Sequence, residues 1–416
     1  MLDLEWPRDD FSRVQYRLYH DSSIYEQEHE RIFRGPAWSL LCLEAEIPNS
    51  GDFVTTHVGQ IPVVVNRMKS GAIGGFVNRC AHRGAEIVRE PYGNSADFTC
   101  IYHAWCYSET GDLLGVPFRR GANGKGGMPP EFDMRAHGLT KLRVAVWNGI
   151  VFGSFSADAE PIEDYLGEMI REHLGEIFGR PLKILGYQRQ RVRANWKLYL
   201  ENVRDAYHGS LLHEFNRTFG LSRLTQVSGA YMDDRHRHSL LFQYAGSDDN
   251  ATARAAYASD QVQRSNYLTL NDTDIIRFVK ENPRGITTRI ISIFPNAVIN
   301  QISNCLATRK VRLYGPDEFE IIFTLFGYAD DDEEMTAHRI NQCNMVGPVG
   351  LISMEDAEAL ELVQRSTAPD QSRFGVVEMG GTGAIQSLDT RVNEVPIRGF
   401  YSYYNELMAN GSGAER

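Results

Sequence analysis

The sequence predicts an α+β protein in which an all-β domain is followed by a domain that combines helices with a long-stranded sheet. Between residues 37 and 155, short apolar runs at 53–56, 61–65 and 150–152 are separated by Gly and Pro, as in an all-β module. Beyond residue 160, segments with apolar residues at i, i+3 and i+4 alternate with strand-like segments. A polar connection at 156–161 lies between the two patterns, so we place the domain boundary near residue 156.

The same patterns predict the individual elements in order along the chain. A helix is expected near residues 24–33, ahead of the β domain. The basic run 235–238 alternates as a strand would, and its side chains could face a pocket or solvent. The other elements expected after the boundary are helices at 162–178, 196–207, 331–345 and 356–364 and strands at 286–291, 302–312 and 320–326.

Charge and composition exclude several classes of function. The chain has 416 residues, with 43 Lys and Arg against 54 Asp and Glu, so its formal net charge is −11. A chain this acidic is a poor candidate for binding nucleic acid or an anionic membrane surface. Hydrophobic residues make up 42% and charged residues 23%, which is typical of a globular protein. No run approaches the roughly 20 apolar residues that span a bilayer, and the first residues resemble no secretion signal, so we expect a cytoplasmic protein.

Two short segments of the expected β domain each carry one Cys and one His. Cys80 and His82 form the first pair, and Cys100 and His103 form the second, in the order C-x-H and C-x-x-H. Two thiolates and two imidazoles could hold one tetrahedral zinc ion. They could also hold a two-iron, two-sulfide cluster in which two histidines replace two cysteines on one iron.

The order of these residues favours the two-iron cluster. With one Cys and one His on each segment, two β-loops can approach a cluster from opposite sides, so both thiolates reach one iron and both imidazoles the other. Common zinc sites instead pair Cys-x-x-Cys with His-x-x-x-His. Neutral imidazoles raise the reduction potential, so such a cluster accepts electrons readily from a ferredoxin or flavin donor. The other cysteines have no His at matching spacing and are expected to be buried apolar side chains: Cys42, Cys106, Cys305 and Cys343.

The run 195–213 contains an acid and two histidines at close spacing. Asp205 and His208 are three residues apart and would share one face of a helix. His208 and His213 are five residues apart, about 140° around an ideal helix, so both can face one ion only if the helix breaks. Gly209 and Ser210 lie where that break is needed.

Two imidazoles and one distant carboxylate would form the facial triad of a mononuclear ferrous oxygenase, which leaves positions open for O₂. The candidate carboxylates lie at the start of an expected helix, where Asp356 is preferred and Glu355 and Glu358 are rivals. Taken alone, the segment could equally hold a core His and a surface His. The cluster motif upstream favours the oxygenase, because O₂ activation at one iron needs an additional electron, which the first site can store.

With these motifs the chain resembles the large (α) subunit of Rieske non-haem iron ring-hydroxylating oxygenases, over residues 25–404. The Cys and His pairs match one family motif, Asp205, His208 and His213 match another, and Asp356 matches the third iron ligand. The resemblance implies a [2Fe-2S] Rieske cluster and a mononuclear Fe(II). It also implies a helical N-terminal segment (1–36) that packs with the catalytic domain, a Rieske domain (37–156), and a catalytic domain (157–416) with a long antiparallel sheet flanked by helices, in a helix-grip-like fold.

The resemblance further implies an assembly and a path for electrons. Three α subunits would form a ring, alone or with three small β subunits, so that the cluster of one subunit serves the iron of its neighbour. Asp205 would be catalytic without binding iron, because it would join His208 of its own chain to His103 of the next chain. A carboxylate between two imidazole N–H donors suits charge-assisted hydrogen bonds. Electrons would come from NAD(P)H through a reductase and usually a ferredoxin.

Narrower matches imply an aromatic carboxylate as the substrate. The runs 115–121, 182–187 and 234–238 resemble salicylate hydroxylases, and 347–350 and 353–356 resemble terephthalate and anthranilate dioxygenases. Salicylate, giving catechol or gentisate, is therefore expected first, with terephthalate or anthranilate as alternatives. A buried arginine is the natural partner of a carboxylate. Arg309 is similar in position to a carboxylate-binding Arg of the terephthalate enzymes, Arg391 matches a second such position, and Asn202 is a further candidate contact.

Two rival classes stay open: a Rieske electron carrier without oxygenase activity, and a zinc-stabilised binding protein. The long chain after the cluster domain, with His208 and His213, argues against the carrier. Colour and metal content separate all three. Zinc leaves the protein colourless, a carrier holds about two irons per chain, and an oxygenase holds about three.

Overall fold

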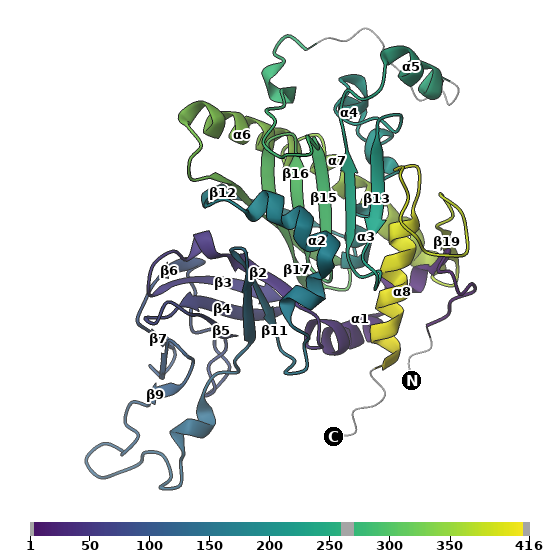
Figure 1. Ribbon diagram of the computed structural model, residues 1–416. Helices are drawn as coiled ribbons and strands as arrows, with labels where there is room; N and C mark the ends of the chain where they lie inside the picture. Colours follow the sequence, from purple (N-terminus) through teal and green to yellow (C-terminus); the bar gives the residue numbers. More distant parts are fainter. Residues whose placement is uncertain (1–3, 259–269, 411–416) are drawn as a thin grey trace. The chain divides into compact units, whose positions relative to one another are not determined.

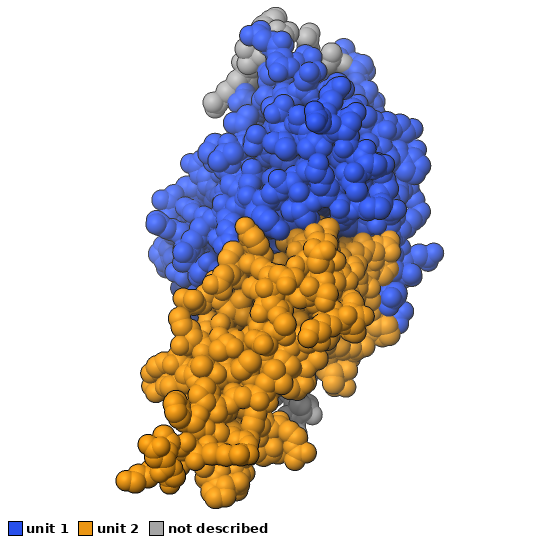
Figure 2. Space-filling view, turned by 90° about the vertical axis from the view of Figure 1, so that its left-hand side faces the viewer, with its two compact units in different colours: residues 1–32, 163–416 blue, residues 33–162 orange. Residues whose placement is uncertain are grey.

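The computed structural model describes residues 4–258 and 270–410, which form two compact units. One unit combines residues 1–32 with 163–416, and the other comprises residues 33–162; Figure 2 distinguishes them by colour. The limits differ by a few residues from the boundaries expected at 36 and 156. Within the described ranges, no helix is long and apolar enough to cross a membrane.

The unit of residues 33–162 consists of three small sheets whose strands all pair antiparallel. Short turns join many of them; Asn148 and Gly149, with φ of 44° and 79°, make the two-residue hairpin between β10 and β11, as right-handed strand twist favours. The sheets are β2 (Ser39–Leu43), β11 (Ile150–Ser154) and β10 (Arg143–Trp147); β5 (Ile73–Val77), β4 (Ile61–Arg67), β3 (Asp52–Val58) and β6 (Tyr92–Asn94); and β7 (Asp97–Thr99), β8 (Cys106–Ser108) and β9 (Leu113–Gly115).

The other unit is built on a seven-stranded antiparallel sheet in the order β12-β18-β17-β16-β15-β14-β13. Six of its strands follow one another along the chain, so the sheet is a meander to which β12 is added beside β18. The strands are β12 (Leu182–Val192), β13 (Ser228–Met232), β14 (Ser239–Gln243), β15 (Thr288–Ile293), β16 (Ala297–Ile302), β17 (Cys305–Gly315) and β18 (Glu318–Tyr328). A separate pair joins β1 (Arg13–Gln15) to β19 (Phe374–Val376).

Helices flank this sheet, and Figure 1 shows α2 across the front of the sheet and α8 beside its β13 edge. The helices are α1 (Ser22–Glu28), α2 (Ile162–Phe178), α3 (Trp196–Asn202), α4 (Glu214–Thr218), α5 (Asn250–Ala258), α6 (Glu333–Val346), α7 (Ser353–Thr367) and α8 (Val395–Asn410). Single turns of tighter or wider helix occur at η1 (Tyr16–Tyr19), η2 (His29–Phe33), η3 (Glu44–Glu46), η4 (Met134–His137), η5 (His208–Ser210), η6 (Asp274–Ile276) and η7 (Ala368–Asp370).

The two faces of the large sheet serve different purposes, as β15 shows. Successive side chains of a strand point to opposite faces. Arg289 turns towards α2, where it donates to the main-chain oxygen of His173 and pairs with Glu176. Its neighbours Thr288 and Ile290 face the opposite way and line a cavity that also touches α3 and the start of α7. One face therefore packs on α2, and the other forms the wall of a site.

Three expected elements differ from the structure. The helix expected to reach residue 207 ends at Asn202, because Arg204 donates from its side chain to the oxygen of Leu200 and Asp205 accepts from the amides of Tyr207 and His208. An aspartate that captures nearby amides competes with helix formation.

The run 235–238 is likewise not a strand; it lies in the turn between β13 and β14, with His236 at φ 61°. Asp233 closes this turn by accepting from the amide of His238. Arg237 and His238 are buried against α2, not directed into the cavity. The strand expected at 302–312 is also interrupted, since a turn at 303–304 separates β16 from β17. Cys106, expected to be buried, is only partly buried.

Candidate metal centres and active site

The two Cys–His segments form loops of the same construction in the unit of residues 33–162. The amide of Cys80 donates to Ala85 O at 2.8 Å, and the amide of Cys100 donates to Trp105 O at 2.9 Å. A second hydrogen bond closes each loop, in which the main-chain oxygen of the Cys accepts from the amide of a residue with a left-handed backbone. This residue is Gly84 (φ 78°) in the first loop and Ala104 (φ 54°) in the second. Each Cys thus lies at the base of a tight loop with its His farther along, as two arms that approach a cluster require.

The cysteines and histidines of these loops differ in their exposure to solvent. Cys80 and Cys100 are buried, whereas His82 is partly exposed and His103 is exposed. The two imidazole rings lie 4.6 Å apart between centroids, and His82 stacks on Trp105 at 4.7 Å. Such a donor set fits a cluster with one iron held by buried thiolates and the other by imidazoles at the surface.

The two thiols lie buried, with a tyrosine hydroxyl close to one of them. Burial and the neighbouring thiol of Cys80 raise the pKa of Cys100. The hydroxyl of Tyr107 lies 3.2 Å from Cys80 Sγ and accepts a bond from the amide of Ala81. Hydrogen bonds to cluster sulfurs and burial are the means by which a protein sets the potential of such a centre.

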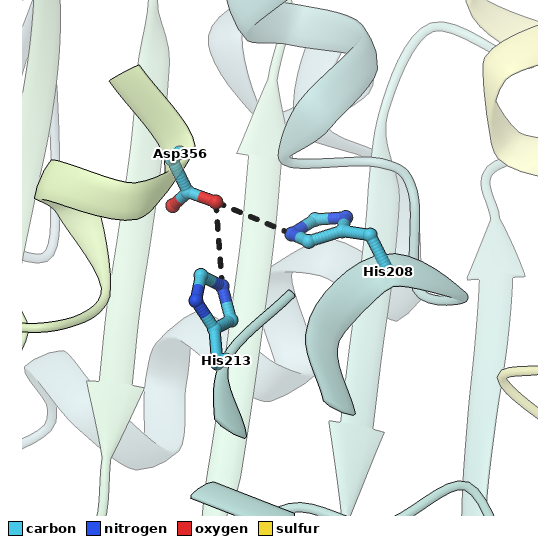
Figure 3. Close-up of side chains that lie close together, drawn as sticks. All are labelled: His208, His213 and Asp356. Carbon is cyan, nitrogen blue, oxygen red and sulfur yellow. Dashed lines mark ion pairs between the residues drawn. The ribbon is translucent and has the colours of Figure 1, made fainter. Parts of the chain in front are cut away.

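His208, His213 and Asp356 converge in the other unit, as Figure 3 shows. One oxygen of Asp356 lies 3.3 Å from Nε2 of each histidine. Two ligands about 2.1 Å from one ion and at right angles lie roughly 3 Å apart, so this spacing fits a shared metal. The break in the helix after Asn202 and the turn η5 bring the two histidines to one point, although they are five residues apart.

Three polar side chains hold this triad from outside. Asp205 lies 3.2 Å from His208 Nδ1, Glu355 lies 2.7 Å from His213 Nδ1, and Asn202 donates to Asp356 at 3.1 Å. Each histidine therefore presents Nε2 to the shared point, while its other nitrogen is held by a carboxylate, as is usual for metal-binding imidazoles. Glu355, a rival for the third ligand, thus lies on the far nitrogen of His213, and Glu358 is not part of the group.

Electrostatics at the triad favours positive charge. Burial alone lowers the pKa of His208, but hydrogen bonds to Asp205 and Asp356 outweigh it and raise that pKa to about 10. Burial raises the pKa of Asp356, yet the bonds to His208 and His213 hold it well below its usual range. A site that retains a carboxylate in its interior is prepared for a cation.

The triad opens into a cavity that carries two buried arginines. Arg309 on β17 donates to Asn300 Oδ1 at 2.7 Å, and Arg391, ahead of α8, donates to Ser222 Oγ at 2.9 Å. Among the described residues, neither guanidinium pairs with a carboxylate, and Nε of each has no hydrogen-bond partner. Burial lowers the pKa of Arg391 to about 10. The cavity is lined by Asn202, Val203, Asp205, Ala206, His208, Gly209, His213, Asn216, Leu221, Ser222, Leu241, Phe242, Thr288, Ile290, Ile302, Ser303, Arg309, Ile352, Asp356 and Arg391.

The structure thus gathers every site residue expected in the catalytic domain around one cavity, Asn202 included. Sequence reasoning missed Asn216 and Ser222 and the supporting role of Glu355. Asn216 had one available signal, because it follows His213 by three residues and so lies one helical turn from a candidate ligand. Ser222 had none, because it reaches the cavity only through the irregular chain after α4.

Two family models match the chain in the two regions that hold these sites. Residues 37–125 match the Rieske [2Fe-2S] domain, and residues 178–410 match the catalytic domain of the ring hydroxylating alpha subunit. This chain belongs to the ring-hydroxylating oxygenase alpha subunits. It is accordingly the large subunit of a Rieske aromatic ring-hydroxylating oxygenase, an oxidoreductase of a family that binds a [2Fe-2S] cluster and a mononuclear iron. Alpha subunits of this family work with ferredoxin and reductase partners and form multimers.

Curated relatives cover nearly the whole chain. The anthranilate 1,2-dioxygenase large subunit of Burkholderia cepacia is 47% identical over 98% of this chain and 96% of its own length. The terephthalate 1,2-dioxygenase terminal oxygenase component subunit alpha 2 of Comamonas sp. is 42% identical, with 97% of each chain covered. The salicylate 5-hydroxylase large oxygenase component of Ralstonia sp. is 42% identical, with 98% and 96% covered.

Solved structures agree on the fold. The naphthalene 1,2-dioxygenase of Rhodococcus sp. bound to indole superimposes with a TM-score of 0.79 at 26% identity and covers 96% of this chain and 95% of that chain. The expected α+β class, with a β-rich cluster domain and a long antiparallel sheet in the catalytic domain, is confirmed.

Proposed function

We propose that this subunit hydroxylates an aromatic ring that carries a carboxylate. The observation that carries the proposal is the pair of buried guanidiniums, Arg309 and Arg391, in the cavity of the His208–His213–Asp356 triad. A buried cation without an anionic partner is unfavourable, so an anionic ligand that enters the cavity gains strong, charge-assisted bonds. The planar fork of arginine matches a carboxylate in particular.

Three acids are the first substrates to consider, because relatives named for them cover the whole chain at similar identity. Anthranilate and salicylate each carry one carboxylate beside an amino or hydroxyl group. Terephthalate, with two carboxylates, is a second candidate that the presence of two guanidiniums favours. Salicylate, expected first from the sequence, therefore shares its place with anthranilate.

The metal-binding roles proposed for the chain follow from the two donor sets. Cys80, His82, Cys100 and His103 hold the cluster, and His208, His213 and Asp356 hold the iron. When bound, the iron supplies open positions for O₂ and the cluster supplies electrons one at a time.

The protein's own side chains then orient the ligands and exclude water. Asp205, 3.2 Å from Nδ1 of His208, would orient that ring through its charge, and Glu355 orients His213 by a hydrogen bond at Nδ1. Asn202 holds the oxygen of Asp356 that lies near both histidines. Apolar side chains close the cavity around the ring of the substrate, among them Leu241, Phe242 and Ile290.

We also propose how the chain assembles. His103 is exposed on its loop, so it is free to meet another molecule. In a ring of three subunits it would donate to Asp205 of a neighbouring copy, which would link one chain's cluster to the next chain's iron. A small β subunit, a ferredoxin and an NAD(P)H-dependent reductase would complete the system.

The substrate proposal is tested by turnover of the reconstituted system with salicylate, anthranilate and terephthalate, and with toluene as an uncharged ring. We expect hydroxylated product from at least one acid and none from toluene. Arg309→Gln and Arg391→Gln should each raise KM for that acid, by about tenfold or more for the arginine that holds the carboxylate. Arg365→Gln, an exposed arginine on α7, is the matched control. Unchanged KM in both cavity variants would overturn the carboxylate site.

A further inference from the structure

One polar side chain in the wall of the catalytic cavity has no task in the mechanism above. Asn216 lies on α4, three residues after the ligand His213, and is 6% exposed. It lines the cavity with the triad and the two arginines. In the described part of the chain its side-chain amide makes no hydrogen bond, and its Oδ1 is an enclosed acceptor without a partner.

Most other neutral polar side chains of the cavity already have hydrogen-bond partners within the protein. Asn202 donates to Asp356, Ser222 accepts from Arg391, and Thr288 accepts from Gln243. Ser303, at the turn between β16 and β17, also has a free hydroxyl as far as the described residues show, and it is therefore the rival of Asn216. Buried amides are nearly always hydrogen-bonded in native proteins, so an unsatisfied one in a ligand cavity indicates a bond completed by the ligand.

The position of Asn216 relative to Arg391 limits what that ligand group can be. The main-chain oxygen of Asn216 accepts from the amide of Ser222 at 3.2 Å, and Ser222 Oγ accepts from Arg391 at 2.9 Å. The main chain of Asn216 is thus bonded to the residue whose side chain holds the guanidinium, and both side chains line the same cavity. Arg391 in turn lies near the metal triad, because a Cβ built on Gly209, next to His208, would be 3.8 Å from its Nη1. On a benzene ring, the substituent nearest to a carboxylate is the ortho one.

We infer that the side-chain amide of Asn216 recognises a hydrogen-bond-donating group, amino or hydroxyl, ortho to the carboxylate of the substrate acid. The inference rests on the proposed function and names the substrate class within it. The amide oxygen accepts from the ortho group, while the acid is held by a cavity arginine. An apolar residue at 216 would offer no such bond, so the residue sets specificity between ortho-substituted acids and benzoate.

Anthranilate and salicylate differ in the number of hydrogen-bond donors on the ortho group. An aromatic amine has two N–H donors, so anthranilate can bond to its own carboxylate and to Asn216 at the same time. Salicylate has a single O–H, which must be shared between the two acceptors. Loss of the amide should therefore weaken anthranilate binding more than salicylate binding.

The experiment measures dissociation constants by titration calorimetry on the oxygenase with both metal centres loaded and no electron donor. The ligands are anthranilate, salicylate, benzoate, 3-hydroxybenzoate, 4-hydroxybenzoate and terephthalate. We expect tighter binding of the two ortho-substituted acids than of benzoate. In Asn216→Leu, anthranilate should bind about tenfold more weakly, salicylate less so, and benzoate within about twofold of its original value.

Two further variants serve as controls. Asn344→Leu makes the same substitution at an exposed position on α6 and should change none of the constants. Asn216→Ala gives the same comparison should leucine disturb α4, and unchanged iron content verifies the site.

Each remaining outcome decides against a part of the proposal. An ortho preference that survives Asn216→Leu but disappears in Ser303→Ala assigns the contact to Ser303 and overturns ours. A stronger effect on the 3- or 4-hydroxy isomer overturns the ortho position. Binding of terephthalate alone overturns the inference and leaves the proposed function standing, whereas binding of none of the acids overturns both.

Discussion

The two regions proposed to bind metal in this chain are constructed in opposite ways. At the cluster motif, main-chain hydrogen bonds shape two matching loops, the cysteines are buried and the histidines reach the surface. At the triad, side chains do the positioning: Asp205, Glu355 and Asn202 hold His208, His213 and Asp356 at the wall of an enclosed cavity. The difference teaches that a centre which exchanges electrons needs an exposed edge, whereas a centre which meets a substrate needs a shaped, buried environment.

The largest test of this comparison removes one ligand from each region. His213→Ala should abolish turnover, because two ligands cannot hold the iron, and should lower iron from about three to about two per chain. Its red-brown colour and cluster spectrum should persist. His82→Ala should do the reverse, with loss of the cluster and retention of one iron. Loss of both centres in either variant would show that the two sites do not form independently.

A smaller effect is expected from Asp205→Asn, which keeps the shape of the side chain and removes its charge. Both metals should stay bound, because Asp205 lies beside Nδ1 of His208 and not beside Nε2, the atom that faces the shared metal point. Reoxidation of the reduced cluster in the presence of O₂ and substrate, followed by stopped-flow absorbance, should slow by roughly 10- to 100-fold. A normal rate at full metal content would exclude the proposed link between subunits.

The smallest effect is expected from Tyr107→Phe, a change in the cluster region alone. The variant loses the hydroxyl that lies 3.2 Å from Cys80 Sγ and retains the buried ring. Because a hydrogen bond to a sulfur ligand stabilises the reduced, more negative cluster, its loss should lower the reduction potential. Titration monitored by circular dichroism measures the shift, and iron content and the dissociation constant for substrate should not change. An unaltered potential would show that the tyrosine only closes the core.

Much of both sites could be predicted because their residues lie close together in sequence. The spacing of Cys80 and His82, and that of His208 and His213, is required by few structures other than metal sites. The need for a break after His208 also follows from the geometry of an ideal helix, since the two histidines could not otherwise meet. Asp356 is distant, yet the start of an expected helix limited the choice to three acids.

The remainder depends on tertiary structure that local patterns do not contain. Asp205 ends α3 early by capturing two amides, whereas the apolar pattern alone continues to residue 207. The basic run 235–238 alternates like a strand, but Asp233 closes it into the turn of a hairpin by accepting from the amide of His238. Ser222 joins the main chain of Asn216 to the side chain of Arg391 in the cavity wall, and no spacing in the sequence indicates that link.

Alternation along β15 has a consequence for how such an enzyme can change its substrate. Arg289 is bonded to α2, whereas Thr288 and Ile290 line the cavity on the opposite face of the sheet. Exchanges at 288 and 290 can therefore reshape the wall around the ring without loosening the layer behind it. A one-residue insertion in the strand would do the opposite, because it would direct a guanidinium at the substrate and remove one of the two arginines that pair with Glu176. The substrate cavity can therefore change through substitutions at these positions, but not through a shift in the register of β15.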